Sequence, residues 1–273
     1  MKFRRGFFFL TATKMILFPN AKINIGLYVI AKREDGYHDI ETIFYPSDLT
    51  DILEIKPAKE EGKGKCTIKT SGLRVDCPQE KNLIYKAYMM LSEDYGLPAV
   101  NVHLHKIIPF QAGLGGGSSD AAFMLKGLNS MFSLGMDNPT LEKYAARLGC
   151  DCPFFIENKS AFATGRGDIL TPIDLDLESG YTIKCIKPEC SVSTKEAFAG
   201  IHTGNAPFDL RTLGSLPIEQ WKEKVTNDFE EKILEHHPEI ARLKERMYRE
   251  GAVYASMSGS GSAVFGIFRK DKE

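Results

Sequence analysis

The chain has 273 residues and 43% of them are hydrophobic, so it can bury a sizeable core as one large domain or two smaller ones. Its formal net charge is −1 and it has no basic block, which argues against a nucleic-acid partner. No apolar run is long enough to cross a bilayer, and the six cysteines form no CxxC pair. We therefore expect a cytoplasmic protein with reduced thiols, no membrane partner and no zinc site.

The first residues resemble a secretion signal only in part. Met1–Arg5 is basic and Gly6–Leu10 is apolar, but the apolar part is short, Lys14 interrupts it, and no A-x-A site follows. A much more structured pattern begins at Met15. We therefore expect residues 1–14 to be a mobile upstream extension or a misassigned start.

Alternating residues predict strands near the beginning of the chain. Residues 21–29 place Lys22 and Asn24 on one face and isoleucine, leucine and valine on the other, which predicts a half-buried strand. A turn at residues 33–38 ends in Tyr37 and His38. Further strands are expected at residues 40–45, 51–55 and 100–106.

Two features of the next part are structural. Asn82 is placed to cap a helix that Gly96 ends. His103 and His105 alternate on one strand face, where two histidines could hold a metal. Because no third ligand is nearby in the sequence, a polar sheet face is the favoured interpretation.

The glycine-rich segment Pro109–Asp120 follows the strand at residues 100–106 and precedes a helical run over 121–132. Its glycines, at 113, 115, 116 and 117, allow positive φ and a close approach to a ligand. The next residues, Ser118-Ser119-Asp120, are common N-cap types, so backbone N–H groups and the positive helix end would converge. This favours a phosphate site over a plain flexible turn. The segment is neither a Walker A loop nor GxGxxG, and the chain has no HRD or DFG tripeptide.

Asp151 is the next candidate for chemistry. A helix is expected from Asn138-Pro139 to Gly149, and Cys150-Asp151-Cys152 comes directly after it. A carboxylate between cysteines and a Pro-Phe-Phe run should be partly desolvated, so it needs a partner or a function. The alternative is a capping aspartate in an ordinary turn.

From about residue 161 the pattern indicates a second α+β unit. Ser193 or Thr194 should cap a short helix that carries Phe198. His236 and His237 fall at a predicted helix break and are most simply solvated. The other elements expected are a strand at 181–187, helices at 218–235 and 239–249, and strands at 253–257 and 263–268 around a Gly/Ser loop at 258–262.

Three separated segments together resemble the motifs of the GHMP kinases: residues 19–24, 109–119 and 258–261. Within that superfamily, Asp35–His38 and Gly149–Phe155 resemble the 4-(cytidine 5′-diphospho)-2-C-methyl-D-erythritol kinase family. The resemblance extends from Pro19 to about Phe268, and one departure is Cys150, where the family more often has a small residue such as alanine.

The resemblance implies an α+β, two-domain GHMP kinase fold with the active site between the domains. The first domain, residues 15–162, would resemble domain 2 of ribosomal protein S5, and the second, residues 163–273, would be ferredoxin-like. The implied reaction is ATP-dependent phosphorylation of the 2-hydroxyl of a cytidine diphosphate alcohol in the non-mevalonate isoprenoid route. The enzyme would use Mg²⁺ with ATP and act as a monomer or weak homodimer.

The same resemblance assigns the site residues. Asp151 would be the catalytic aspartate and Lys22 its lysine, while the metal ligands stay unassigned apart from Ser119 as a candidate contact. ATP would lie along the residues Pro109, Phe110, Gln111, Ala112, Gly113, Leu114, Gly115, Gly116, Gly117, Ser118 and Ser119. The alcohol substrate would contact Asn24, Tyr37, His38, Thr194, Phe198, Gly259 and Ser260.

Two other classes of function stay open at this point. One is another GHMP kinase that acts on homoserine or a mevalonate-type acid, although Tyr37, His38 and Phe198 suit a substrate that carries a base. The other is an inactive nucleotide-binding or RNA-binding relative, which the presence of Lys22 and Asp151 and the lack of a basic patch oppose.

Overall fold

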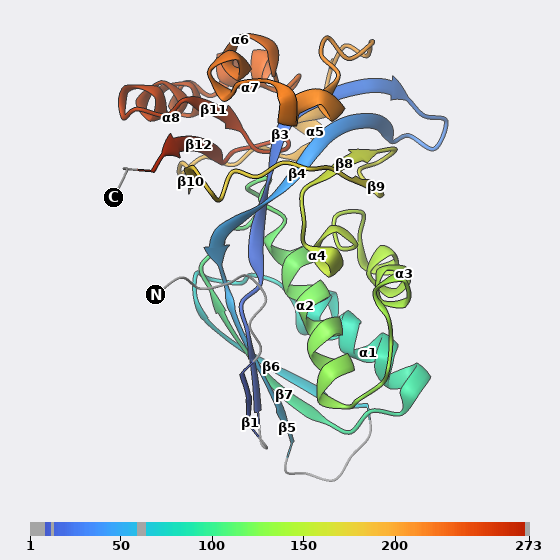
Figure 1. Cartoon of the computed structure of the whole chain (residues 1–273). Coiled ribbons are helices and arrows are strands. Elements are labelled where there is room, and N and C mark those ends of the chain that lie inside the picture. Colours follow the sequence, from blue (N-terminus) through green and yellow to red (C-terminus); the bar gives the residue numbers. More distant parts are fainter. Residues whose placement is uncertain (1–8, 12–13, 59–63, 271–273) are drawn as a thin grey trace. The chain divides into compact units, whose positions relative to one another are not determined.

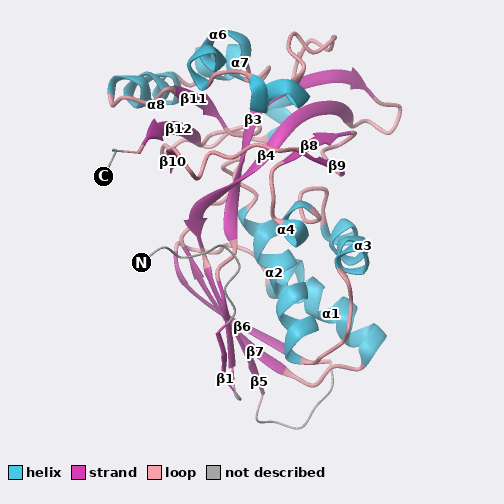
Figure 2. Ribbon diagram, viewed as in Figure 1, coloured by secondary structure: helices cyan, strands magenta, loops and turns pink. Residues whose placement is uncertain are grey.

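The computed structural model describes residues 9–11, 14–58 and 64–270, and the chain divides into two compact units. Unit 1 is built from the residues up to Ala21 together with 48–110 and 115–158 (Figure 1). Unit 2 is built from residues 22–47, 111–114 and 159 onward. Both combine sheets with helices (Figure 2). The structure thus groups 22–47 with the C-terminal part of the chain, whereas the predicted domains, 15–162 and 163–273, kept them with the N-terminal part.

Unit 1 is a five-stranded sheet covered by helices, with α1 and α2 packed against the strands. Neighbouring strands are antiparallel except β6 and β7, which are parallel. In sheet order the strands are β1 (Phe9–Thr11), β2 (Lys14–Leu17), β5 (Ile52–Pro57), β7 (Val100–Lys106) and β6 (Cys66–Gly72). The helices are η1 (Gln79–Lys81), α1 (Leu83–Tyr95), α2 (Gly116–Met131), α3 (Asn138–Leu148) and α4 (Phe154–Glu157).

The predicted extension, residues 1–14, lies mostly outside the described residues. Within it, the backbone of β1 pairs antiparallel with β2, so this piece is a strand where no regular structure was expected. The rest of that expectation stays a prediction.

Capping explains the two helices of unit 1 whose ends were predicted well. The Asn82 side chain accepts from the amide of Ile84 at the start of α1, and Gly96 ends the helix with φ 65°. Helix α3 ends at Gly149 as expected, although its N-cap is Asp137, one residue earlier than predicted.

Helix α2 corrects the prediction made for the glycine-rich segment. It begins at Gly116, with Gly115 as N-cap at φ 67°, and no side chain caps it. Ser118, Ser119 and Asp120 were expected to be cap residues, but they lie within the helix. A glycine in the left-handed region lets the chain enter the helix without a side-chain cap.

Unit 2 contains two further sheets and the remaining helices. One sheet has the order β3 (Asn20–Lys32), β4 (His38–Thr50), β8 (Ala161–Thr164) and β9 (Ile169–Pro172), and the first residues of β3 and the last of β4 belong to unit 1. The other has the order β10 (Tyr181–Ile186), β12 (Val264–Arg269) and β11 (Tyr254–Met257). The helices are α5 (Thr194–Phe198), η2 (Leu210–Ser215), η3 (Ile218–Gln220), α6 (Trp221–Lys224), α7 (Glu230–His236) and α8 (Pro238–Arg249). Within the described ranges, no helix is long and apolar enough to span a membrane.

The long helix predicted over residues 218–235 is wrong, because it is broken between α6 and α7. The break pairs with strand β3: the amide of Leu27 donates to the carbonyl of Thr226, and the amide of Asp228 donates to that of Leu27. Asn227 is buried there and donates to the carbonyls of Met257 and Gly259. Backbone pairing with a neighbouring strand therefore outweighs helix propensity at this point.

Strand β3 was expected to be half-buried, and that expectation is also wrong. Lys22, Asn24 and Tyr28, which alternate with the apolar residues, are each at most 4% exposed. Their polar groups have partners inside unit 2, including the carbonyl of Lys224 for the Tyr28 hydroxyl. Internal hydrogen bonds remove much of the cost of burying polar side chains.

Candidate active site

Parts of the three motifs found in the sequence, at residues 22–24, 111–114 and 258–261, come together inside unit 2. The amide of Lys22 donates to the carbonyl of Leu114, and the amide of Ala263 donates to that of Ala112. The Ser258 hydroxyl donates to the Gly113 carbonyl at 2.8 Å and accepts from the amide of Asn24 at 3.3 Å. One serine therefore joins segments that lie more than a hundred residues apart.

Gly113 cannot carry a side chain at this junction. Its φ is 73°, and a Cβ there would lie 1.8 Å from the carbonyl oxygen of Ser258. Gly259, with φ 57°, lies beside it: a Cβ on Gly259 would be 3.3 Å from both the Gly113 Cα and the Asn24 Oδ1. Two glycines thus let two backbone segments touch: a side chain on Gly113 would prevent the contact, and one on Gly259 would crowd it in a positive-φ conformation that favours glycine.

Lys22 and Asn24 point from β3 into a polar cluster. The Lys22 ammonium donates to Asn24 Oδ1 at 2.6 Å and lies 4.5 Å from the centroid of the Phe44 ring. Asn24 Nδ2 in turn donates to the Thr42 hydroxyl at 3.0 Å. The lysine is therefore held at a fixed point by an amide and an aromatic face, and Phe44 and Thr42 are neighbours that the sequence did not indicate.

The other part of the glycine-rich segment belongs to unit 1 and begins α2. A Cβ on Gly116 would lie 2.8 Å from Ile108 Cγ2 and 3.0 Å from Lys106 Nζ, so packing requires this glycine. Gly117 differs, because a Cβ there would meet nothing within 4 Å. Of these two glycines, Gly117 is thus the one that structural packing alone does not explain.

Ser119 adds a polar atom at the same helix start. Its hydroxyl oxygen is buried and, among the residues that the structure describes, has no hydrogen-bond partner. A buried hydroxyl without a partner costs free energy unless a ligand uses it.

Asp151 lies half-buried in the turn between α3 and α4, also in unit 1. Its neighbour Cys152 is fully buried, and burial raises the pKa of that thiol to about 12. A hydrogen bond between Cys152 and the Ser118 side chain ties this turn to the first turn of α2. The structure therefore brings the Asp151 turn beside the helix start that follows the glycines, and Cys152 itself stays protonated. The catalytic role of Asp151 stays a prediction.

The predicted base-binding residues gather in unit 2. The His38 and Phe198 rings stack with centroids 4.5 Å apart, and Phe229 packs edge-on against Phe198 at 4.8 Å. Tyr37 is 56% exposed, with the Arg166 guanidinium 5.2 Å from its ring centroid. The predicted domain boundary separates Tyr37 from Phe198, but the structure places both in unit 2, and it is His38 that contacts Phe198.

Thr194 and Ser260 complete the predicted set. Thr194 is the exposed first residue of α5, and Ser193 caps that helix in a capping box with Glu196. Ser260 lies in the loop between β11 and β12, next to Gly259.

A buried ion cluster in unit 1 was missed by the sequence analysis. The Lys106 ammonium lies between two carboxylates, 2.5 Å from Asp51 Oδ2 and 2.7 Å from Asp120 Oδ2, with side chains at most 4% exposed. Asp51 Oδ1 also accepts from the amides of Ile107 and Ile108. The cluster therefore links α2 to the backbone just before Pro109. One signal in the sequence could have revealed the cluster: Lys106 continues the alternating series of apolar residues on the buried side of β7, where a charged residue needs a partner.

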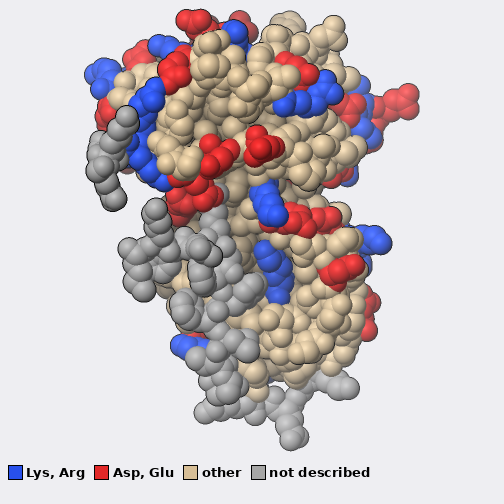
Figure 3. Space-filling model, viewed as in Figure 1, with Lys and Arg blue, Asp and Glu red and all other residues tan. Residues whose placement is uncertain are grey.

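Burial raises the pKa of Asp120, and the nearby Asp51 carboxylate adds to the rise. Two carboxylates that share one ammonium would otherwise leave the cluster with a net negative charge in a low-dielectric site. At the surface, by contrast, acidic and basic side chains occur together on the face shown in Figure 3.

Comparison with known proteins identifies the family. The family model described as "GHMP kinases N terminal domain" matches residues 82–159, and the model described as "GHMP kinases C terminal" matches residues 215–273. A 4-diphosphocytidyl-2-C-methyl-D-erythritol kinase of Bacteroides thetaiotaomicron is 50% identical over 257 residues, which cover 94% of this chain and 93% of that protein. The enzyme of the same name from Chlorobium limicola is 41% identical over 93% of this chain and 88% of its own length. The chain belongs to the 4-diphosphocytidyl-2-C-methyl-D-erythritol kinase family of the GHMP kinases.

Solved structures agree with this assignment. A crystal structure of a 4-(cytidine 5′-diphospho)-2C-methyl-D-erythritol kinase superposes with a TM-score of 0.75 at 32% identity, covering 93% of this chain and 90% of that one. A homoserine kinase from Cytophaga hutchinsonii has a TM-score of 0.65 at 15% identity, covering 96% of this chain and 87% of its own, which shows the shared fold alone. The predicted GHMP kinase fold is thus confirmed.

Proposed function

We propose that this kinase transfers the γ-phosphoryl group of ATP to the 2-hydroxyl of 4-(cytidine 5′-diphospho)-2-C-methyl-D-erythritol, giving the 2-phosphate and ADP. The relatives that bear this enzyme's name are about as long as this chain and up to 50% identical to it. The observation that carries the proposal is the meeting of all three motifs through Ser258, Gly113 and Asn24. The reaction belongs to the non-mevalonate isoprenoid route that the resemblance indicated.

In the proposed mechanism, Asp151 accepts the proton of the attacking hydroxyl and Lys22 supplies positive charge to the transferring group. Phosphoryl transfer depends mainly on positioning and charge neutralisation. The Asn24 and Phe44 contacts hold the Lys22 ammonium at a fixed point, so that little reorganisation is needed during the reaction. The backbone from Gly115 to Ser118 donates N–H groups to the phosphates at the start of α2, whereas the amide of Ser119 already donates to the Gly115 carbonyl within the helix.

Mg²⁺ fits the residues present. Ser119 Oγ is a hard oxygen ligand, buried and without a partner among the described residues, at the helix start where the phosphates would lie. We propose that Ser119, together with phosphate oxygens, holds the ion. When bound, Mg²⁺ neutralises phosphate charge.

For the substrate, we propose that the cytosine binds beside Tyr37, His38 and Phe198. The diphosphate and alcohol would contact Asn24, Gly259, Ser260 and Thr194. Because both substrates are charged nucleotides, we also propose a cytoplasmic enzyme, monomeric or weakly dimeric, without a membrane or nucleic-acid partner.

An ADP-release assay tests the proposal directly. The cytidine diphosphate alcohol should be phosphorylated far faster than homoserine or mevalonate at equal concentration, because neither of those substrates offers a base to the aromatic residues. Equal turnover of the three alcohols would contradict the proposal, and ATP hydrolysis without any acceptor serves as the blank.

A further inference from the structure

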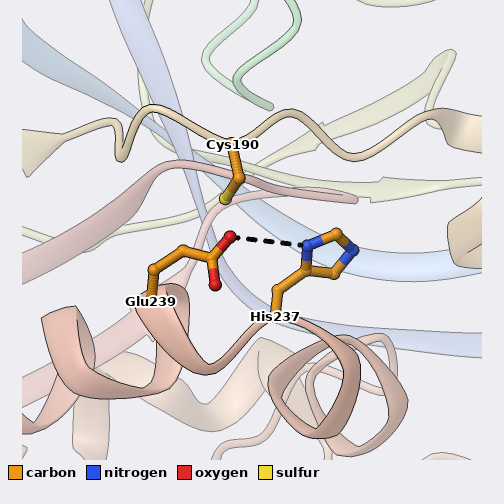
Figure 4. Close-up of side chains that lie close together, drawn as sticks. All are labelled: Cys190, His237 and Glu239. Atoms are coloured by element: carbon orange, nitrogen blue, oxygen red, sulfur yellow. Dashed lines mark ion pairs between the residues drawn. The ribbon is translucent and has the colours of Figure 1, made fainter.

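We propose that Cys190, His237 and Glu239 form a binding site for a divalent transition-metal ion of the zinc class. One ligand atom from each residue lies within 4.8 Å of the others. Figure 4 shows the Cys190 sulfur and the Glu239 carboxylate side by side, with the His237 ring turned toward the carboxylate. In a tetrahedral zinc site, ligand atoms lie about 3.3–3.7 Å apart, given metal–ligand bonds of about 2.0–2.3 Å. Shifts of about an ångström would therefore close the site.

The backbone positions of the three residues are well fixed. Cys190 follows β10, and its carbonyl accepts from Lys187 Nζ at 2.9 Å and from the Ser262 hydroxyl at 2.7 Å. His237 and Glu239 flank Pro238 at the junction of α7 and α8, and Ile240 behind them is fully buried in the core of unit 2. Both segments are thus anchored, which leaves the side chains to adjust.

The histidine is oriented as metal-binding histidines usually are. His237 Nε2 lies 2.7 Å from Glu196 Oε1, while Nδ1 faces Glu239 Oε1 at 3.8 Å. When Nε2–H donates to a carboxylate, the lone pair of the neutral ring is on Nδ1, toward the cluster. Glu196 thus acts as the outer partner that sets the tautomer, and it corrects the expectation that His237 is simply solvated.

Charge and ligand type select the ion. A thiolate, a carboxylate and a neutral imidazole carry two negative charges, which match a divalent cation. Burial and the hydrogen bond to Glu239 raise the pKa of the Cys190 thiol to about 11, so the incoming ion must displace the thiol proton to solvent. Sulfur and nitrogen ligands favour Zn²⁺ or Co²⁺ and disfavour Mg²⁺. The His237 and Glu239 side chains are 19% and 40% exposed, so water can reach the site as a fourth ligand.

The sequence could not reveal this site, because Cys190 and the other two ligands are far apart and match no zinc motif. The fold brings them together through the packing of α8 against the strands of unit 2.

The test is a Co²⁺ titration of the whole, reduced and metal-stripped protein, followed by optical absorption. We expect one equivalent to bind with a thiolate-to-metal charge-transfer band, Zn²⁺ to displace it, and millimolar Mg²⁺ to leave it unchanged. Zn²⁺ should also raise the melting temperature. Cys190→Ser should abolish the band, and His237→Gln should weaken binding at least about tenfold. Glu196→Gln, an outer-partner change, should weaken it about 10–100-fold.

Matched controls are available in the chain. Cys185→Ser removes another half-buried thiol, which contacts Ser47, and His236→Gln changes the exposed histidine next to the site. Both should bind Co²⁺ as the wild type does. The proposal is overturned when the wild type shows no charge-transfer band, or when the band persists in Cys190→Ser. If Cys190→Ser does not fold, unchanged affinity in folded His237→Gln overturns it equally.

Discussion

Asp151 is the residue whose chemistry can be isolated most cleanly. Its turn is held by the buried Cys152 and by the bond to Ser118 rather than by its own carboxylate alone. We therefore expect Asp151→Asn to keep the wild-type melting temperature and ATP KM while kcat falls about 10²–10⁴-fold, the usual contribution of a positioned base. Steady-state kinetics measures kcat and the ATP KM, and a thermal melt measures the melting temperature. Asp174→Asn, at an exposed position, is the control. Near-normal turnover of folded Asp151→Asn would exclude it as the base.

Phe198 needs a different design, because the ring has structural contacts as well as a proposed ligand. It stacks on His38 and packs edge-on against Phe229, so Phe198→Ala should lower stability. Phe198→Leu keeps much of the apolar volume but loses the aromatic face. Base stacking is worth about 1–3 kcal/mol, so this variant should raise the KM for the cytidine substrate about five- to a hundredfold.

The ATP KM of Phe198→Leu serves as the internal reference and should stay unchanged. A drop in melting temperature with both KM values unchanged would make Phe198 a core residue only, and the base pocket would have to be sought elsewhere.

At the scale of the elements, the start of α2 separates packing from ligand binding. A methyl group added to Gly117 would project into open space, so Gly117→Ala should leave stability nearly unchanged. We expect its ATP KM to rise at least about tenfold, because the methyl group would stand where the phosphates approach the backbone. Gly180→Ala is the matched control, since a Cβ there also meets nothing within 4 Å.

Gly113→Ala should behave in the opposite way. Its Cβ would overlap the Ser258 carbonyl, so the variant should be destabilised. The outcome that would contradict the Gly117 prediction is an equal ATP KM in Gly117→Ala and Gly180→Ala. The glycine-rich segment before α2 would then serve a structural role only.

The buried cluster on β7 and α2 makes a prediction about pH. Because the folded-state pKa of Asp120 is raised, the folded protein holds a proton that the unfolded chain releases above about pH 4. The stabilisation that comes from holding this proton on Asp120 is fully present at low pH and is lost as pH rises through the folded-state pKa of Asp120. Asp120→Asn cannot lose that proton. The free energy of unfolding of Asp120→Asn relative to wild type should therefore increase from pH 5 to pH 8, as urea denaturation would measure, and a constant difference would contradict the assignment.

Local signals predicted the elements whose ends depend on nearby residues, and they failed where distant segments intervene. The Asn82 cap, the Gly96 stop and the Ser193 cap act within a few residues and were found. The break at Asn227 and the burial of both faces of β3 depend on pairing between segments two hundred residues apart. Single-sequence periodicity carries no record of such pairing.

For the site, residue types and their spacing indicated the phosphate segment and Asp151, and the family resemblance supplied the other roles. Neither revealed the Lys106 cluster or the aromatic support beneath Lys22, because those contacts depend on the folded arrangement alone.

At the scale of the whole molecule, the chain divides its proposed tasks between the units. Asp151, Gly117 and Ser119 belong to unit 1, whereas Lys22, His38 and Phe198 belong to unit 2. The segment at 111–114 belongs to unit 2 although the residues on either side of it belong to unit 1. A reaction that uses residues of both units therefore requires the intact chain. Binding of a ligand to the unit 1 residues can nevertheless be measured separately from binding of a ligand to the unit 2 residues.

Ligand-linked stability tests this division. A ligand that binds only the folded state raises the free energy of unfolding by about 2.7 kcal/mol at a hundred times its Kd. CDP, the part of the substrate with the base, and Mg-ADP should each stabilise the wild type to that extent. Phe198→Leu should lose most of the CDP effect and keep the ADP effect, and Gly117→Ala should do the reverse, because each change removes contacts to one ligand. Equal losses for both ligands in both variants would mean that the substitutions act through the fold as a whole, and would reject the separate assignment of nucleotide and substrate residues.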